Sequence, residues 1–72
     1  MQQLVINGNV YNGKYRFTKQ DQVTFIEIFI PGGIPLSSDG VLNVTLPTDP
    51  PHTIKVKIIN AANDNLVGRV IQ

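Results

Sequence analysis

The chain has 72 residues, with six basic residues, five acidic residues, one histidine and no cysteine. This length allows one domain with a modest core, and the absence of cysteine excludes disulfides as a means of stabilising it. The net charge of +1 at pH 7 creates no strong field of either sign, so the composition does not favour a dedicated binder of nucleic acid or of anionic membranes.

The first predicted elements are two strands joined by a hairpin. Residues 3–11 and residues 14–18 alternate in the way that β-strands do, and Asn12-Gly13 lies between them. Asn-Gly is a strong hairpin signal because a type I′ turn needs positive φ at both central positions. Asn7-Gly8 is a second such pair, and if it forms the turn, the first predicted strand splits in two.

Two aromatic residues of the second predicted strand share one face. Tyr15 and Phe17 point one way, whereas Lys14 and Arg16 point the other way. The sequence therefore places the two aromatic side chains in the hydrophobic core.

The third predicted strand, residues 23–30, is apolar on both of its faces. Phe25 and Phe29 lie on one face with Glu27 between them, and Ile26 and Ile28 lie on the other. A strand with two apolar faces is expected to be covered on both sides. One face is expected to pack on the core of the chain, and the other face is expected to pack on a second copy of the chain. The candidate interface residues are Phe25, Ile26, Ile28, Phe29, Ile30 and Ile34.

Three further strands are predicted in the second half of the chain, over residues 41–46, 53–60 and 66–71. The segment 31–40 and the proline-rich segment 47–51 are irregular connections. Turn signals every eight to twelve residues are typical of an all-β fold. We expect a single β domain over residues 1–72, built as a small antiparallel β-sandwich or barrel of five to six short strands.

The residues suited to catalysis are few. Ser37 or Ser38, Asp39 and His52 are the parts of a nucleophilic triad, but no nucleophile elbow accompanies them. Glu27 is expected to pair with Lys57 or Arg16 on a neighbouring strand. The sequence therefore predicts no catalytic residues and a protein that is not an enzyme.

No cofactor or metal site is predicted either. His52 is the only soft or borderline ligand for zinc, and residues 63–65 offer too few oxygen atoms for a calcium loop. The glycines at positions 32 and 33 lack the Lys-Ser/Thr pair and the helix of a phosphate-binding loop. No apolar segment is long enough to span a bilayer, and no signal peptide is evident, which indicates cytoplasmic synthesis.

An alternative interpretation is an OB-like protein that binds single-stranded nucleic acid. Aromatic platforms between cations hold single strands, and the candidate residues for that role are Tyr11, Lys14, Arg16 and Lys19. A second alternative is a small inhibitor or accessory protein that binds a host enzyme.

Part of the second half of the chain resembles small β-modules of phage and viral tail-fibre, spike and capsid-decoration proteins. The resemblance rests on Val44-Thr45-Leu46-Pro47 and on the strand that runs from Thr53 to Ala61. Pro50-Pro51-His52 departs from it, because a glycine-rich turn is more usual at that place. The resemblance implies a structural or receptor-contacting part that assembles, commonly as a trimer.

Size and resemblance lead to one functional expectation. A domain this small usually needs an additional stabilising element, and oligomerisation remains once disulfides and zinc are set aside. We expect a non-enzymatic structural or recognition module, associated with a phage or other virion. It is expected to act as a homo-oligomer, trimer or dimer, and to contact a protein or a glycan.

Overall fold

The structure, a computed structural model, describes residues 2–71 and is all-β. Residues 2–71 form no helix with the length and apolarity that a membrane crossing needs. The strands are β1 (Gln2–Ile6), β2 (Asn9–Gln20), β3 (Val23–Phe29), β4 (Val41–Leu46), β5 (His52–Ala61) and β6 (Asn65–Val70).

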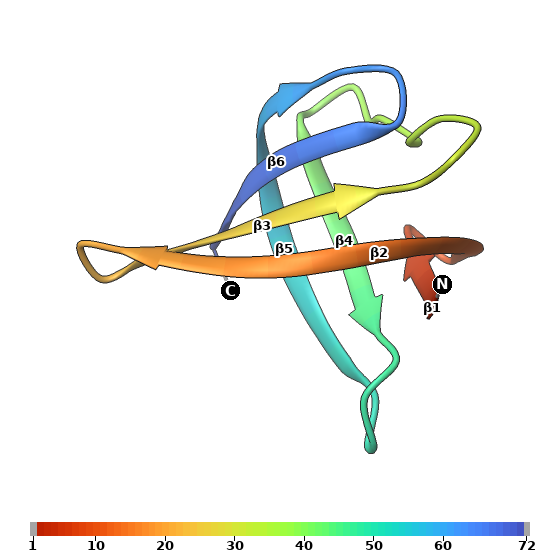
Figure 1. The fold of residues 1–72 in the computed structure, drawn as a ribbon, viewed down its shortest axis with the longest axis horizontal. Coiled ribbons are helices and arrows are strands. Elements are labelled where there is room, and N and C mark those ends of the chain that lie inside the picture. Colours follow the sequence, from red (N-terminus) through yellow and green to blue (C-terminus); the bar gives the residue numbers. More distant parts are fainter. Residues whose placement is uncertain (1, 72) are drawn as a thin grey trace.

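The six strands close into an antiparallel barrel with the order β1-β2-β3-β6-β5-β4 (Figure 1). The chain therefore forms two meanders of three strands, β1–β3 and β4–β6, linked by the segment 30–40. The meanders meet at two places, where β3 pairs with β6 and where β1 pairs with β4. The expected class, a small all-β barrel or sandwich, is confirmed, and closure of the sheet makes it a barrel.

The first hairpin turn lies at Asn7-Gly8, with φ angles of 50° and 88°, and not at Asn12-Gly13. The first predicted strand is therefore split, and β2 runs without a break through Asn12 and Gly13 to Gln20. The expectation of a turn at Asn12-Gly13 is wrong because Gly13 serves another purpose. A Cβ atom at that position would lie 2.3 Å from the carbonyl oxygen of Phe29, so only glycine fits there.

The two long central strands, β2 and β5, each change partner along their length. β2 pairs with β1 as far as Gly13 and with β3 from Lys14 onward. β5 pairs with β4 as far as Lys57 and with β6 from Val56 onward. At the second of these places a Cβ atom on Gly68 of β6 would lie 2.2 Å from the Cγ1 atom of Val56. Glycine thus permits the close approach of the strands where the barrel bends.

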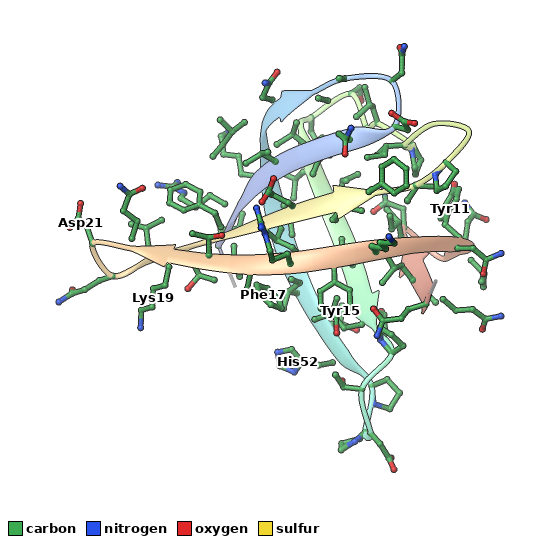
Figure 2. All side chains as sticks on the ribbon, in the orientation of Figure 1. Tyr11, Tyr15, Phe17, Lys19, Asp21 and His52 are labelled. Atoms are coloured by element: carbon green, nitrogen blue, oxygen red, sulfur yellow. The ribbon has the colours of Figure 1, made fainter. Side chains whose placement is uncertain are left out.

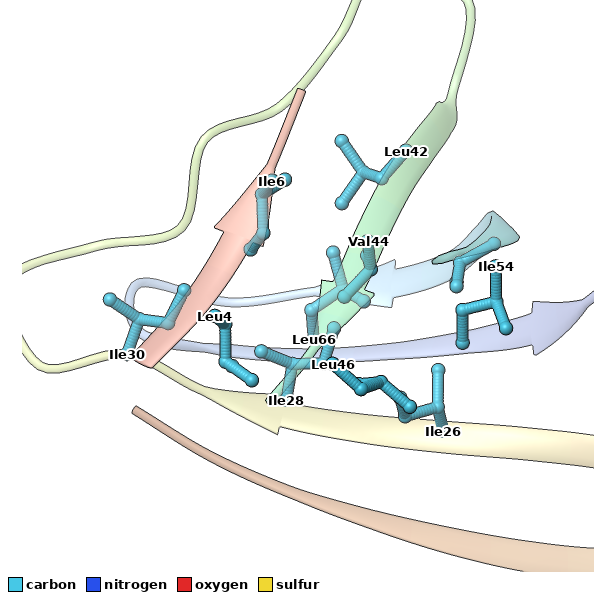
Figure 3. Packing of buried hydrophobic residues seen from close by; sticks show 11 residues of the cluster. Leu4, Ile6, Ile26, Ile28, Ile30, Leu42, Val44, Leu46, Ile54 and Leu66 are labelled. Atoms are coloured by element: carbon cyan, nitrogen blue, oxygen red, sulfur yellow. The ribbon is translucent and has the colours of Figure 1, made fainter. Parts of the chain in front are cut away.

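The barrel interior is filled by aliphatic side chains that alternate along every strand (Figure 3). None of the buried residues among 2–71 is polar or charged. The strands alternate as expected in the second half of the chain, where Leu42, Val44 and Leu46 point inward. The buried hydrophobic residues are Leu4, Ile6, Ile26, Ile28, Ile30, Leu42, Val44, Leu46, Ile54, Val56 and Leu66.

Three residues expected at a subunit interface lie inside the barrel. Ile26, Ile28 and Ile30 are 0%, 1% and 3% exposed, and they pack against the other core residues of the same chain. They cannot contact a second subunit while the barrel is closed. Their assignment to the candidate interface is therefore corrected, and only the opposite face of β3 faces outward.

The expectation that Tyr15 and Phe17 belong to the core is only partly right. Tyr15 is half-buried and packs against the core, but Phe17 is 43% exposed. Both residues point to the inner side of β2. Phe17 is exposed because it lies in the second half of β2, past Gly13, where β1 no longer runs beside the strand. The β2–β3 hairpin projects past the rest of the barrel beyond this point (Figure 1).

The seam between β1 and β4 is short and depends on Asn7. Only two residue pairs join the strands, Val5 with Thr45 and Ile6 with Val44. Beyond them, the backbone N–H of Asn7 donates to the carbonyl oxygen of Asn43 at 2.9 Å. The backbone N–H of Asn43 donates in return to Oδ1 of Asn7, also at 2.9 Å. Asn7 thus extends the seam with one backbone bond and one side-chain bond.

Gly13→Ala tests the close approach at the bend of β2. The φ angle of Gly13 is not in the left-handed region, so the added methyl group acts through its clash with β3 alone. We expect a loss of about 1–3 kcal/mol in the free energy of unfolding, measured by urea denaturation. The control, Asn12→Ala, changes an exposed neighbour and should stay within about 0.5 kcal/mol of the wild type.

Asn7→Gly tests the seam. Glycine keeps the positive φ angle but removes the side-chain acceptor from the N–H group of Asn43. We expect the free energy of unfolding to fall by about 0.5–1.5 kcal/mol. Asn7→Asp retains an acceptor oxygen and should recover most of that loss. Equal stability of Asn7→Gly and the wild type would show that the side-chain bond contributes nothing to closure.

Candidate contact surface

The outward face of β3 is where the structure places the remaining interface candidates. Val23, Phe25, Glu27 and Phe29 alternate with the buried isoleucines and are half-buried. β3 is hydrogen-bonded on both sides, to β2 and to β6, so it is not an edge strand. The neighbouring side chains of the same chain therefore cover part of this apolar face, and the rest is open to solvent.

A hollow of about 310 Å³ lies over the outer surface of β3, β6 and β5. Two cross-strand pairs build it, because Arg69 of β6 stands opposite Phe25 of β3 on one side and opposite Lys57 of β5 on the other. A bulge in β5 between Ile58 and Asn60 accompanies Ile59, which is 57% exposed. The hollow is lined by Val23, Phe25, Lys57, Ile58, Ile59 and Arg69.

Arg69 also borders a second, open hollow of about 550 Å³. Its other lining residues come from the β2–β3 turn, the start of β3 and the end of β6: Gln22, Val23, Thr24, Val70 and Ile71. Val23 and Arg69 are common to the two hollows. The surface thus combines an apolar floor with the two cations Arg69 and Lys57. Its chemistry suits a partner that offers an apolar group beside an anionic one.

The mid-strand carboxylate Glu27 belongs to an ion pair on this outer surface. Glu27 stands opposite Arg16 in the β2–β3 register, and Nε of Arg16 donates to Oε1 of Glu27 at 3.0 Å. The terminal nitrogen of Arg16 contacts the same oxygen. Of the two expected partners it is Arg16, and not Lys57, that pairs with Glu27. The side chains are 75% and 46% exposed, so the pair contributes at most about 1 kcal/mol.

The two irregular connections predicted from the sequence lie at opposite ends of β4. The segment 31–40 precedes Val41, the first residue of β4, and the segment 47–51 follows Leu46, the last one (Figure 1). Within the first segment Ile34 packs against the core, so it is at most a partial contributor to an interface. A strand of six residues keeps the two segments about 20 Å apart. They therefore do not form one contact patch.

The four residues of the nucleic-acid alternative do not form one surface. All four lie on β2, but Tyr11 points inward and packs against the core. Lys14 and Arg16 point outward, and Arg16 is paired with Glu27. Lys19 lies in the projecting part of the hairpin and has the opposite orientation, because its position in the strand is odd. The structure therefore does not bring an aromatic platform and free cations together there.

The imagined triad is not assembled. The hydroxyl of Ser37 lies 2.8 Å from Oδ1 of Asp39, but both residues precede β4. His52 begins β5 after the connection at the other end of β4, and it stands opposite Leu46. Within residues 2–71 no three His, Cys, Asp or Glu side chains gather in a way that could hold a metal ion.

Comparison with known proteins yields no match to a protein family, to a curated protein or to a solved structure.

The surface around Arg69 was not predicted from the sequence, in which Lys57 is only a possible partner of Glu27. One sequence feature could have indicated this surface. Val23 and Phe25 in the strand predicted over residues 23–30, and Lys57 in the strand predicted over residues 53–60, all point outward. The position of Arg69 between Phe25 and Lys57 follows from the pairing of β6 with both β3 and β5, and that pairing is not encoded locally.

The segment before β4 is held by a small polar network around Asp39. Oδ1 of Asp39 accepts from the hydroxyl of Ser37 and, at 3.1 Å, from the backbone N–H of Val41. The same hydroxyl lies 2.6 Å from the carbonyl oxygen of Val41, so its single proton is shared between two acceptors. The hydrogen bond from Ser37, and next that from Val41, hold the pKa of Asp39 below its usual value of 3.8.

This pKa shift predicts a contribution to acid stability. Because the pKa is lower in the folded state, the contribution is present above the pKa of the unfolded chain. It is lost as the pH falls through the folded pKa. Asp39→Asn should therefore show a smaller loss of stability below about pH 4 than the wild type. Ser37→Ala should move the pKa of Asp39 back toward its usual value, as measured by NMR titration of the carboxyl carbon. Titration of Asp39 at its usual value in the wild type would contradict this assignment.

Proposed function

We propose that this protein is a non-enzymatic structural or recognition module that works by assembling with copies of itself and contacting a protein or glycan. Association with a phage or other virion is part of the proposal and rests on the resemblance of the second half of the chain to tail-fibre, spike and decoration modules. A homo-oligomer, dimer or trimer, is the proposed working form.

One observation carries the proposal. The buried aliphatic residues fill the interior of the barrel, and further apolar side chains remain on its outer surface. Eleven aliphatic side chains fill the core. Val23, Phe25 and Ile59 nevertheless line an outer hollow. Exposed apolar side chains beside polar ones are typical of surfaces that meet a partner. The hollow is open, so the surface fits contact with another macromolecule better than enclosure of a small substrate.

The low charge of the chain supports the same proposal. Charged residues make up 15% of the sequence, compared with about 25% in typical soluble domains. Three of the six basic residues, Lys55, Lys57 and Arg69, lie on β5 and β6 and are exposed. Two of these three, Lys57 and Arg69, line the apolar hollow, where they can orient a partner.

The solution mass tests the assembly part of the proposal. We expect native mass spectrometry and light scattering to detect a small multiple of the 7.9 kDa chain. The measurement covers a series from about 1 µM to about 1 mM, a range of ordinary affinities. A strict monomer throughout that series would contradict assembly as the working principle.

An oligonucleotide titration tests the competing function. Binding of a fluorescent oligothymidylate at low salt, with an affinity that falls steeply as salt rises, is what a single-strand binder would give. We expect no such binding, because Tyr11 is directed toward the core and Arg16 is paired with Glu27. Tight, salt-sensitive binding would overturn the proposed function in favour of nucleic-acid recognition.

A further inference from the structure

The second half of β2 has an open edge. β1 pairs with β2 through Gly13, whereas β3 pairs with β2 from Lys14 to Gln20. β1 and β3 lie on opposite sides of β2 in the barrel. In the part of the chain that the structure describes, no strand therefore lies beside residues 15–20 on the β1 side.

The hairpin turns determine which backbone groups point to that edge. Asn7-Gly8 and Asp21-Gln22 are both two-residue turns with positive φ angles. The pairs that close such turns, Ile6 with Asn9 and Gln20 with Val23, exchange both of their backbone hydrogen bonds. Since bonding direction alternates along a strand, the even-numbered residues of β2 after Gly13 bond to β3. The N–H and C=O groups of Tyr15, Phe17 and Lys19 point to the open side.

Of the three side chains at this edge, those of Phe17 and Lys19 are exposed and that of Tyr15 is half-buried. The hairpin projects beyond the barrel, and Figure 2 shows Tyr15, Phe17 and Lys19 projecting from the same side of β2. The rings of Tyr15 and Phe17 meet edge to face, with centroids 5.7 Å apart and an interplanar angle of 76°. Phe17 remains 43% exposed. An open edge that carries an exposed aromatic residue is a ready template for another strand.

We propose that the occupant of this edge is a second copy of the same chain, whose β2 pairs antiparallel with the first across a two-fold axis at Phe17. The inference rests on the proposed function and names the surface through which the chain assembles. The two six-stranded barrels are then joined by backbone hydrogen bonds between β2 of one copy and β2 of the other. Three residues of each chain, Tyr15, Phe17 and Lys19, contribute the hydrogen bonds of that ladder.

The sequence around Phe17 is complementary to itself in this register. Tyr15 stands opposite Lys19 of the other copy, and Arg16 stands opposite Thr18. Lys14 stands opposite Gln20, so no two like charges face each other. Cross-strand pairs of an aromatic residue with a cation are favourable, and two aromatic residues meet at the axis.

Neighbouring registers are less favourable. A register centred on Arg16 or on Lys19 places two like charges directly opposite each other, which destabilises a strand pair. A register centred on Thr18 leaves Phe17 opposite Lys19 and loses the contact between the two phenylalanines. The register centred on Phe17 is therefore the one that both charge and apolar contact favour.

Charge variants at the two-fold axis test the proposal. Phe17→Glu and Phe17→Lys each place like charges opposite each other, so each alone should weaken self-association by about 100-fold. An equimolar mixture of the two variants should associate again as a heterodimer. Val10→Glu is the matched control, because Val10 is 62% exposed but lies in the first half of β2, which pairs with β1. It should leave the wild-type mass unchanged in light scattering, and circular dichroism checks that every variant is folded.

A cysteine variant tests the register itself. Residues of a hydrogen-bonded antiparallel pair have Cα atoms about 5.5 Å apart, within the range that a disulfide spans. The chain has no cysteine, so Phe17→Cys should oxidise to a covalent dimer, and Val10→Cys at the same concentration should stay largely monomeric. A covalent dimer of equal yield from both variants would contradict the β2–β2 interface.

The outcomes separate this inference from the function on which it rests. Ile59→Glu changes a lining residue of the outer hollow. If the wild type associates, and if Ile59→Glu weakens the association while neither Phe17 variant does, the edge interface is wrong and assembly through the outer hollow stands. If Phe17→Glu associates normally and Phe17→Lys does not, the register centred on Thr18 replaces the one proposed. If the wild type is monomeric throughout, both the interface and the assembly function fail.

Discussion

Closure of the sheet upon itself is the constraint on which the rest of this structure depends. Two residue pairs and the reciprocal bonds of Asn7 and Asn43 join β1 to β4, and without that seam the sheet would have two long free edges. Closure also defines an inside. Every strand must turn one set of alternating side chains toward a narrow interior, and aliphatic residues alone fill it.

A barrel of so few strands has to bend sharply, and the bends determine what the surface offers. β2 and β5 change partners midway, and at Gly13 and Gly68 the strands approach so closely that a Cβ atom has no room. The bend that lets β2 pair with both β1 and β3 leaves the second half of β2 unpaired on its β1 side. Closure therefore removes the long edges of the sheet, and bending leaves short unpaired stretches, one of which is the second half of β2 on its β1 side.

The two proposed surfaces fit different kinds of partner. The edge of β2 offers backbone hydrogen bonds and the aromatic side chain of Phe17, which fits a strand of the same sequence. The hollow beside Arg69 and Lys57 offers apolar side chains with two cations, which fits a partner of different chemistry. Because the hollow lies over β3, β6 and β5 and not at the open edge of β2, the proposed β2–β2 contact would leave it available.

The sequence by itself determined the all-β class, the six-strand scale and the alternation of the second half of the chain, because alternation is a local property of each strand. Leu42, Val44, Ile54 and Val56 are buried as their spacing predicts. Tertiary structure alone decided between the two Asn-Gly pairs, since only the close approach of β3 requires glycine at position 13. It also decided that Phe17 is exposed and that Arg69 stands between Phe25 and Lys57. Exposure and cross-strand neighbours depend on what lies opposite a residue, and closure brings those partners from distant parts of the chain.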